Sequence, residues 1–344
     1  MRRLKKTKMI GSVYLWVFVG TAFIAALFLL AKSVRGPSPV LAGEAAKARK
    51  SQGRSKVPDV DLRKHSVALK DVLFDTFNGS FLRLSDANRS QILSLRDAIR
   101  PIYKPAYAKP DALSWLRDSD LVLGYVSKSG ASAYPLKVLN FREIVNDVID
   151  GVPVLVSYCP LCGSGVVYER KLDGKTLVFG NTSALYESDM VMFDHQTGSY
   201  WFQTMGEAIV GEMTGKRLVP LPSATLAWGD WKRLHPGTRL LAGDGKGPFS
   251  SRYGTNPFSN YARNLNKGRF SFPVSKEKLD SRIRAGEVVI TAELGSDIKA
   301  YPVLIIGKNT VNDEVGGAPS RYSLTGSLAP RSSRRIRAEN SPSG

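Results

Sequence analysis

Two cysteines carry the clearest chemical signal in this chain. Cys159 and Cys162 are the only cysteines among 344 residues. They stand in the segment Tyr-Cys-Pro-Leu-Cys-Gly, directly after an apolar run that predicts a strand over residues 152–158. Thiolates are nucleophiles, soft metal ligands and disulfide formers, so this pair is the candidate catalytic or metal-binding site.

The spacing Cys-x-x-Cys is compatible with a redox function and with metal binding. A disulfide can form across such a turn; the more exposed cysteine then attacks and the other resolves the mixed disulfide. Tetrahedral Zn²⁺ needs further ligands, for which His195 is the first candidate, whereas Cu(I) can be held by two thiolates alone. The expected cofactor is therefore copper, zinc or none.

Two other interpretations stay open. One cysteine can act as a nucleophile with His195 or His235 as its base, although the second thiol then has no role. Alternatively, the pair is a structural turn or disulfide. A loop this short gains little stability from closure, which argues against a purely structural disulfide.

Further polar and aromatic residues are secondary candidates for the site. For each of them a role in the core, in a turn or in capping a turn competes with a functional role. They are Asn146, Asp147, Asp189, Asp194, Trp201 and Gln203. Arg252 and Tyr253 lie in a long loop rich in Gly, Pro and Asn, where we expect them to bind an anion or cofactor.

Short apolar segments separated by turn residues predict a β-rich α+β fold with many short antiparallel strands and hairpins and few helices. Asp173-Gly174 is the clearest hairpin turn, and helices are expected over residues 90–100 and 224–234. So many short links argue against a doubly wound parallel sheet.

An internal repeat runs through this pattern. Tyr134-Pro and Asn146-Asp of a first unit recur as Tyr301-Pro and Asn312-Asp of a second, each pair following a predicted strand. The second unit has no cysteine, so we expect two pseudo-repeated units of which only the first carries thiol chemistry. Because Asn-Asp occurs in both, a turn before the next glycine is its favoured role.

The formal net charge of +19 is concentrated at the ends of the chain. Residues 1–64 contain fourteen Lys and Arg against three acids, and residues 321–344 contain five against one. The middle is close to balanced and lacks the interleaved basic and aromatic residues of nucleic-acid grooves. We therefore expect no nucleic-acid partner.

Residues 9–31 form an uncharged apolar run long enough to cross a bilayer as a helix. Basic residues cluster before it, which predicts a single-pass membrane protein with its N-terminus inside and its main domain extracytoplasmic. A cleaved signal peptide is the alternative, although the run is longer than a usual signal sequence. Either way the cysteines are exported to a compartment where disulfides persist.

These signals divide the chain into six parts. We expect a basic cytoplasmic segment, a transmembrane anchor, a flexible basic linker, a lid or extra layer, the β-rich Cys-x-x-Cys domain and a disordered basic tail. Their bounds are residues 1–8, 9–31, 32–64, 65–97, 98–320 and 321–344, respectively.

A family resemblance rests on ordered motifs. They run from Tyr134-Pro through Glu143-Ile-Val-Asn-Asp147 and Gly151-Val-Pro to Tyr158-Cys-Pro-Leu-Cys-Gly-Ser164, and continue to Trp201 and Gln203. This pattern resembles the signature of an uncharacterised prokaryotic family known only as a domain of unknown function, over about residues 98–319. The chain departs from it at Arg142, where His is frequent, and at His195, where Arg is usual. The resemblance implies kinship and no activity.

Together these features predict a membrane-anchored extracytoplasmic protein whose site is the Cys159/Cys162 pair, acting in thiol redox exchange or soft-metal binding. The competing hypothesis is a non-catalytic, membrane-tethered binding or assembly module in which the cysteine turn is structural. The sequence does not name its protein or small-molecule partner.

Overall fold

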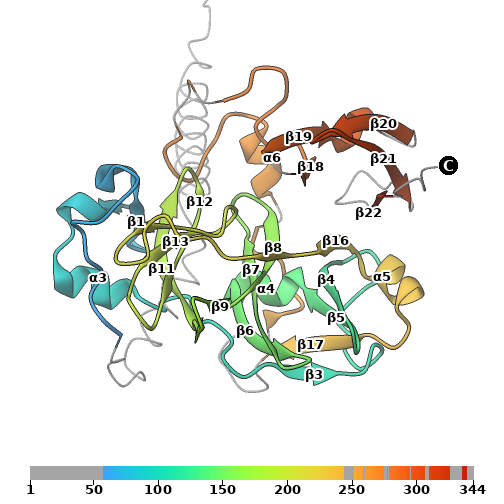
Figure 1. The fold of residues 1–344 in the computed structure, drawn as a ribbon, viewed down its shortest axis with the longest axis horizontal. Coiled ribbons are helices and arrows are strands. Elements are labelled where there is room, and N and C mark those ends of the chain that lie inside the picture. Colours follow the sequence, from blue (N-terminus) through green and yellow to red (C-terminus); the bar gives the residue numbers. More distant parts are fainter. Residues whose placement is uncertain are drawn as a thin grey trace, which may run out of the picture.

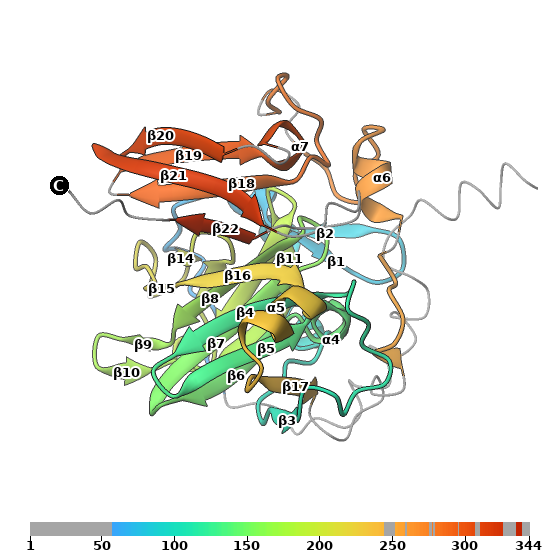
Figure 2. The ribbon, with the colours of Figure 1, turned by 90° about the vertical axis from the view of Figure 1, so that its right-hand side faces the viewer.

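The computed structural model describes residues 57–243, 252–258, 260–274, 277, 279–294, 296–306, 310–325 and 335–338. This part of the chain consists mainly of short strands, with a few short helices between the hairpins (Figures 1 and 2). The prediction of a strand-rich fold with few helices and many antiparallel pairings is confirmed.

The largest sheet has six antiparallel strands. In spatial order they are β14 (Glu207–Val210), β13 (Tyr200–Phe202), β12 (Asp189–Asp194), β11 (Phe179–Tyr186), β1 (Leu73–Asp75) and β2 (Phe81–Arg83). β11 is interrupted by a bulge between Asn181 and Ala184, where Ser183 has a φ of 62°. A bulge bends the strand and redirects its side chains.

A four-stranded antiparallel sheet contains the first cysteine. Its strands are β15 (Pro220–Leu221), β8 (Ser164–Glu169), β7 (Val152–Cys159) and β6 (Ile144–Ile149). The apolar run predicted as a strand is β7, and its last six residues are buried. Beyond β8, the short strands β9 (Lys171–Leu172) and β10 (Lys175–Thr176) form the hairpin across Asp173-Gly174.

The third sheet has five strands. They are β16 (Ser223–Ala227), β4 (Leu121–Ser127), β5 (Gly130–Pro135), β17 (Arg239–Gly243) and β3 (Ala106–Ala108). β5 and β17 pair in parallel, and the other neighbours are antiparallel.

The helices are short and join strands. They are η1 (Leu69–Asp71), η2 (Leu84–Asp86), α3 (Arg89–Leu95), α4 (Leu136–Arg142), α5 (Trp228–Leu234), α6 (Tyr261–Leu265) and α7 (Val303–Ile306). α3 begins with a capping box of Asn88 and Gln91 and ends well before Pro101. The predicted helix over residues 224–234 is wrong in its first part. Those residues pair with β4 as strand β16, because strand pairing outweighs the local amphipathic pattern.

The internal repeat is visible as a repeated hairpin–helix–hairpin unit. The first unit is β4, β5, α4, β6 and β7; the second is β18 (Val289–Leu294), β19 (Asp297–Pro302), α7, β20 (Thr310–Val315) and β21 (Ala318–Thr325). The hydroxyl of Tyr134 donates to Asp147 at 2.9 Å, and that of Tyr301 donates to Asp313 at 2.8 Å. The recurring motif residues therefore make the same contact in both units.

One hydrophobic cluster joins the four-stranded and six-stranded sheets. Leu155 and Cys159 of β7 pack there with Phe179 of β11, Met190 of β12 and Trp201 of β13. Their side chains alternate along the strands, so the inward face of each strand contributes to the cluster. The first cysteine is thus part of the core between two sheets.

Several predicted segments lie partly or wholly outside the residues that the structure describes. No helix within the described residues is both long and apolar enough to span a membrane, and the predicted span over residues 9–31 lies outside them. From the predicted lid, β1 and β2 extend the six-stranded sheet. Within the predicted disordered tail, residues 321–325 belong to β21, which pairs with β22 (Arg335–Ala338).

Candidate metal centre

Strand β7 and the turn after it position both cysteines. β7 and β8 pair as far as Cys159 and Ser164, so the turn between these strands holds Cys162. Gly163 donates its N–H to the Cys159 carbonyl at 2.9 Å and has a φ of 70°, a conformation that glycine adopts without steric cost. Both cysteines are free; Cys159 is buried and Cys162 is exposed.

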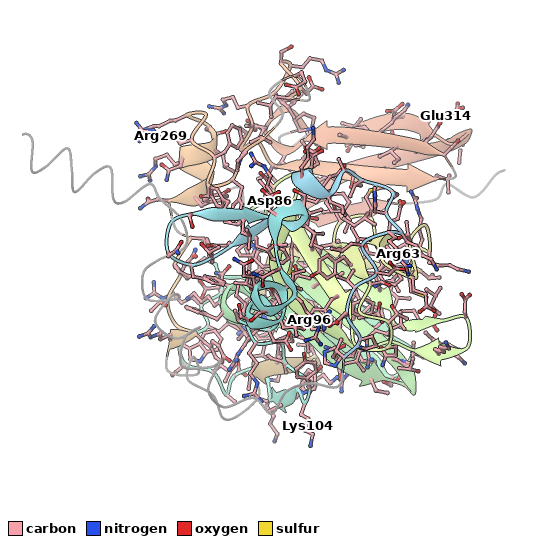
Figure 3. All side chains as sticks on the ribbon, turned by 90° about the vertical axis from the view of Figure 1, so that its left-hand side faces the viewer. Arg63, Asp86, Arg96, Lys104, Arg269 and Glu314 are labelled. Carbon is pink, nitrogen blue, oxygen red and sulfur yellow. The ribbon has the colours of Figure 1, made fainter. Side chains whose placement is uncertain are left out.

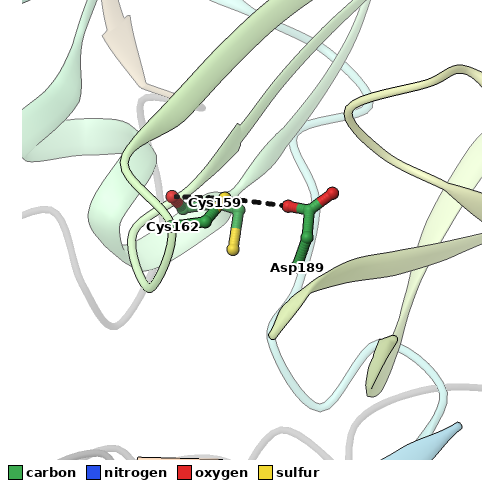
Figure 4. Close-up of side chains that lie close together, drawn as sticks. All are labelled: Cys159, Cys162 and Asp189. Carbon is green, nitrogen blue, oxygen red and sulfur yellow. Dashed lines mark hydrogen bonds between the residues drawn. The ribbon is translucent and has the colours of Figure 1, made fainter. Parts of the chain in front are cut away.

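Asp189, the first residue of β12, lies opposite the cysteines (Figure 4). The Cys162 thiol donates to Asp189 Oδ1, with 2.9 Å between sulfur and oxygen. The second oxygen, Oδ2, accepts the backbone N–H of Thr204 at 2.9 Å, which orients the carboxyl group. The two sulfur atoms and one carboxyl oxygen all lie within 4.8 Å of one another. Three potential ligand atoms therefore converge from two sheets.

A chain of polar side chains supports the exposed cysteine. Ser164 Oγ lies 2.8 Å from Cys162 Sγ and donates to Gln203 Oε1 at 2.8 Å. Gln203 donates from Nε2 to Ser157 Oγ at 3.0 Å, and both of these residues are fully buried. Such a buried and satisfied network rigidifies the turn that carries Cys162.

Burial disfavours ionisation of the acids at this site. It raises the pKa of the Cys159 thiol well above its usual value, and a hydrogen bond with Cys162 raises it further. Burial also raises the pKa of Asp189, and it raises that of the neighbouring Glu143 to about 8. Each shift reflects the cost of placing negative charge in a medium of low dielectric constant.

The described residues supply no positive charge to offset these acids. Neither Asp189 nor Glu143 belongs to any ion pair that they form. Charged side chains such as Arg63, Arg269 and Glu314 instead lie exposed on the outside of the molecule (Figure 3). A buried group of acids without a counter-ion is an arrangement that a bound cation stabilises.

His195 lies away from the cysteine pair. Its Nε2 is 3.1 Å from the hydroxyl of Tyr103, and its ring stacks on Phe193 with the centroids 5.2 Å apart. Burial lowers the pKa of the imidazole. His195 directly follows β12, whereas Asp189 begins that strand, and six strand residues span about 20 Å. The third member of the converging group is therefore Asp189, and the prediction of His195 as that ligand is not supported by its position.

Asp194 and Trp201 have structural contacts. Asp194 Oδ1 accepts the backbone N–H groups of Gln196 and Thr197, so its carboxyl group caps the turn between β12 and β13. Its Oδ2 accepts the indole N–H of Trp201 at 2.9 Å. Trp201 is fully buried, with its ring packed edge-on against Phe179. Neither Asp194 nor Trp201 belongs to the group of potential ligands formed by Cys159, Cys162 and Asp189.

Asn146 and Asp147 lie inside β6, so their expected role in a turn is wrong. Both residues pair with β7 in regular register. The Asn146 side chain donates to the carbonyl of Phe179 and accepts its N–H, both at 2.8 Å, and so connects β6 to β11. Asp147 accepts the Tyr134 hydroxyl. Asn146 therefore links the four-stranded sheet to the six-stranded sheet, and Asp147 links it to the five-stranded sheet.

Tyr253 packs against α4, and Arg252 precedes it in the chain. The buried hydroxyl of Tyr253 accepts a hydrogen bond from Arg142 Nε at 2.9 Å, and its ring lies near those of Phe141 and Trp115. Arg142 is itself fully buried. Arg252 is half-buried. Neither Arg252 nor Tyr253 belongs to the converging group.

Three residues near the cysteines were not predicted as site residues: Glu143 and Asp75, which line a cavity together with Cys159, and Ser164, which contacts Cys162. Glu143 and Ser164 stand within the motifs of the family resemblance, and an acid between two apolar elements was a usable signal for Glu143. Asn181 donates to Glu143 Oε2 at 2.6 Å. Asp75 lies far from the motifs in the chain and gave no such signal.

The fold and the site define a strand-rich protein in which two thiols and one carboxyl group meet between two sheets. The chain belongs to the family described as proteins of unknown function, DUF3179, whose sequence model matches residues 96–341. The family resemblance is thereby confirmed. No curated protein and no solved structure matches the chain.

Proposed function

We propose that the protein binds a metal ion through Cys159, Cys162 and Asp189, and that Zn²⁺ fits best. The observation that carries this proposal is the convergence of two sulfur atoms and a carboxyl oxygen within 4.8 Å. Thiolates and carboxylates are established Zn²⁺ ligands. Three protein ligands leave a fourth tetrahedral position for water or a small ligand, as in zinc sites that carry out chemistry.

The ligand atoms need a small adjustment to hold Zn²⁺. With Zn–S near 2.3 Å and Zn–O near 2.1 Å, a tetrahedral ion places sulfur and oxygen about 3.6 Å apart. Cys162 Sγ and Asp189 Oδ1 are 2.9 Å apart, so they separate by about 0.7 Å when the metal replaces the thiol proton. The Cys162 side chain is exposed, so rotation about its own bonds can supply this movement without a shift of the turn.

Metal binding at this site releases protons. Burial raises the pKa of Cys159 and of Asp189, so both hold their protons more tightly in the metal-free protein. The ligands must lose these protons to bind the ion. Metal affinity is therefore expected to rise with pH.

Cu(I) is the alternative ion. It is bound by two thiolates without a third ligand, and it prefers sulfur to oxygen. In that case Asp189 only accepts a hydrogen bond in the metal-free protein, and its removal leaves the affinity nearly unchanged.

Thiol redox exchange is the second candidate function, favoured by an exposed Cys162 next to a buried Cys159. Cys162 would attack a disulfide substrate and Cys159 would resolve the mixed disulfide. Reactive thiols usually have a cation nearby that stabilises the thiolate. Here the acid Asp189 lies beside Cys162, and burial raises the pKa of Cys159. These features support metal binding better than exchange.

We also propose that the domain carrying the cysteines lies outside the cytoplasm. The apolar residues 9–31, with basic residues before them, support a single membrane anchor with the N-terminus inside. Protease treatment of intact cells with a permeabilised outer envelope tests this arrangement. Cleavage of the domain only after lysis of the inner membrane contradicts it.

Metal analysis of the purified full chain tests the metal centre. We expect one Zn²⁺ per chain after dialysis, and competition with a chromophoric chelator gives the affinity. Cys159→Ser and Cys162→Ser each remove a ligand and should weaken binding by about 100-fold or more, because even partners of ligands contribute about 10–100-fold. Asp189→Asn should weaken it at least tenfold.

The matched control is Asp150→Asn. Asp150 is an exposed carboxyl group with a φ of 54°, a conformation that Asn tolerates, and it does not belong to the converging group. The affinity of this variant should equal that of the unaltered protein. If the protein instead retains Cu(I), and only the two cysteine variants lose it, the site is a copper site and not a zinc site. If the protein retains no metal but Cys159 and Cys162 form a reversible disulfide, redox exchange is favoured. If it neither retains metal nor forms that disulfide, the non-catalytic tethered module is favoured.

A further inference from the structure

An aromatic cavity of about 50 Å³ lies beside Cys159. Four phenylalanine side chains line it: Phe77, Phe141, Phe258 and Phe272. A cavity of about 150 Å³ holds benzene, so this smaller space fits a molecule of a few non-hydrogen atoms. The other two proposed metal ligands do not line this cavity.

Two carboxyl groups, those of Asp75 and Glu143, also line the cavity. Both residues are less than one-tenth exposed. Glu143 Oε2 accepts from Asn181 at 2.6 Å, and Asp75 Oδ1 accepts the N–H of Phe77 at 2.7 Å. Within the described part of the chain, the second oxygen of each has no hydrogen-bond partner, and neither acid forms an ion pair. One oxygen of each acid is therefore available to a ligand.

Three of the eight non-glycine residues with positive φ in the described part of the chain line this cavity. Phe77, Glu143 and Ser183 line it and have φ angles of 59°, 56° and 62°, in the left-handed region that side chains rarely adopt. They come from three separate segments: the turn after β1, the end of α4 and the bulge in β11. Strained residues persist where the surroundings enforce them, and they cluster at binding sites.

The charge balance of the cavity selects for a cation. Burial raises the pKa of Glu143 to about 8 and that of Asp75 to about 6. No basic side chain among the described residues pairs with either group. An anion or an uncharged ligand gives these acids no counter-charge, so neither stabilises their ionised form in the cavity. A positive ligand offsets the cost of ionising them.

We propose that this cavity binds a small organic ammonium ion, such as a short branched or methylated alkylamine. Its ammonium group pairs with Asp75 and Glu143, and its alkyl groups contact the four phenylalanine rings. Aromatic cages recognise methylated ammonium groups through the same combination of cation–π attraction and apolar contact. The inference does not rest on the metal site. However, because Cys159 lines the cavity, a bound amine lies next to a proposed metal ligand.

Paired probes test the charge requirement. Isopropylammonium and 2-propanol have the same size and shape but differ in charge. Their binding to the full chain, purified and stripped of metal at pH 7, is measured by ligand-observed NMR titration. We expect isopropylammonium to bind one saturable site at least ten times more tightly than 2-propanol. Equal affinity of the two probes, or no saturable binding of isopropylammonium, overturns the proposal.

Variants place the binding in the cavity. Asp75→Asn and Glu143→Gln replace each acid with an amide of the same size that cannot ionise to pair with an ammonium group, and each should weaken isopropylammonium binding about tenfold or more. Ala184→Val fills the cavity and should abolish binding, whereas Ala208→Val adds the same atoms to another buried strand residue outside the cavity and should not. Unchanged binding in Ala184→Val or in both charge variants refutes the site. Because the protein is metal-free, these outcomes are independent of the zinc measurement.

Discussion

We expect the protein to lose stability as the pH rises because of Glu143, and Glu143→Gln should remove this effect. Burial raises the pKa of Glu143 from 4.5 to about 8 in the folded protein. Between these values the unfolded chain has lost the proton and the folded protein retains it, so folding binds a proton. The free energy of unfolding therefore falls by about 1.4 kcal/mol per pH unit across this window.

The full shift corresponds to a loss of about 5 kcal/mol by pH 8, after which the contribution of Glu143 is constant. The amide introduced by Glu143→Gln cannot ionise, and its oxygen can still accept the hydrogen bond from Asn181. The difference in unfolding free energy between the variant and the unaltered protein should grow from near zero at pH 4.5 to about 3–5 kcal/mol at pH 8.

Urea unfolding of the metal-free full chain, followed by tryptophan fluorescence at half-unit steps from pH 4.5 to 9, measures this difference. Glu212→Gln, at an exposed position, is the matched control and should show no growing difference. A constant difference between the Glu143→Gln variant and the unaltered protein at all pH values would refute the reasoning, because it would mean that Glu143 ionises equally in both states.

Three further predictions concern packing and hydrogen bonds elsewhere in the fold, and urea midpoints of the variants test them. Gly124→Ala places a methyl group 2.1 Å from the Trp231 ring and should cost about 1–3 kcal/mol, whereas Gly237→Ala meets no atom within 4 Å and should be nearly neutral. Asn146→Ala leaves the buried N–H and carbonyl of Phe179 unpaired and should cost about 2–4 kcal/mol; a loss below 1 kcal/mol would contradict the proposed link between sheets. Tyr134→Phe should cost about 1.5–3 kcal/mol and Tyr301→Phe less, because Asp147 is more deeply buried than Asp313; equal costs would contradict this reasoning.

Local sequence patterns predicted much of the strand structure. The hairpin across Asp173-Gly174 and the hairpin between β4 and β5 were both predicted from their turn residues. Such residues adopt the left-handed backbone conformations that a tight turn requires. Helix limits were less well predicted. Residues 224–227 have the apolar spacing of a helix but form a strand, because pairing with β4 depends on a segment far away in the chain.

The site was predicted in part. The cysteine pair at the end of β7 was evident from the sequence, and so was a repeated scaffold of which only one copy has thiols. His195 was favoured as the additional ligand because of its residue type. The structure brings Asp189 to Cys162 instead, because β12 starts beside the cysteine turn and carries His195 away from it.

The sequence by itself thus determined the chemical groups, the strand that carries them and the repeated framework. Only the tertiary structure decided which acids face the thiols, since Asp75, Glu143 and Asp189 come from separate segments that meet when two sheets pack together. It also decided their proton affinities, because the pKa of an acid depends on burial and on nearby charges rather than on its place in the chain.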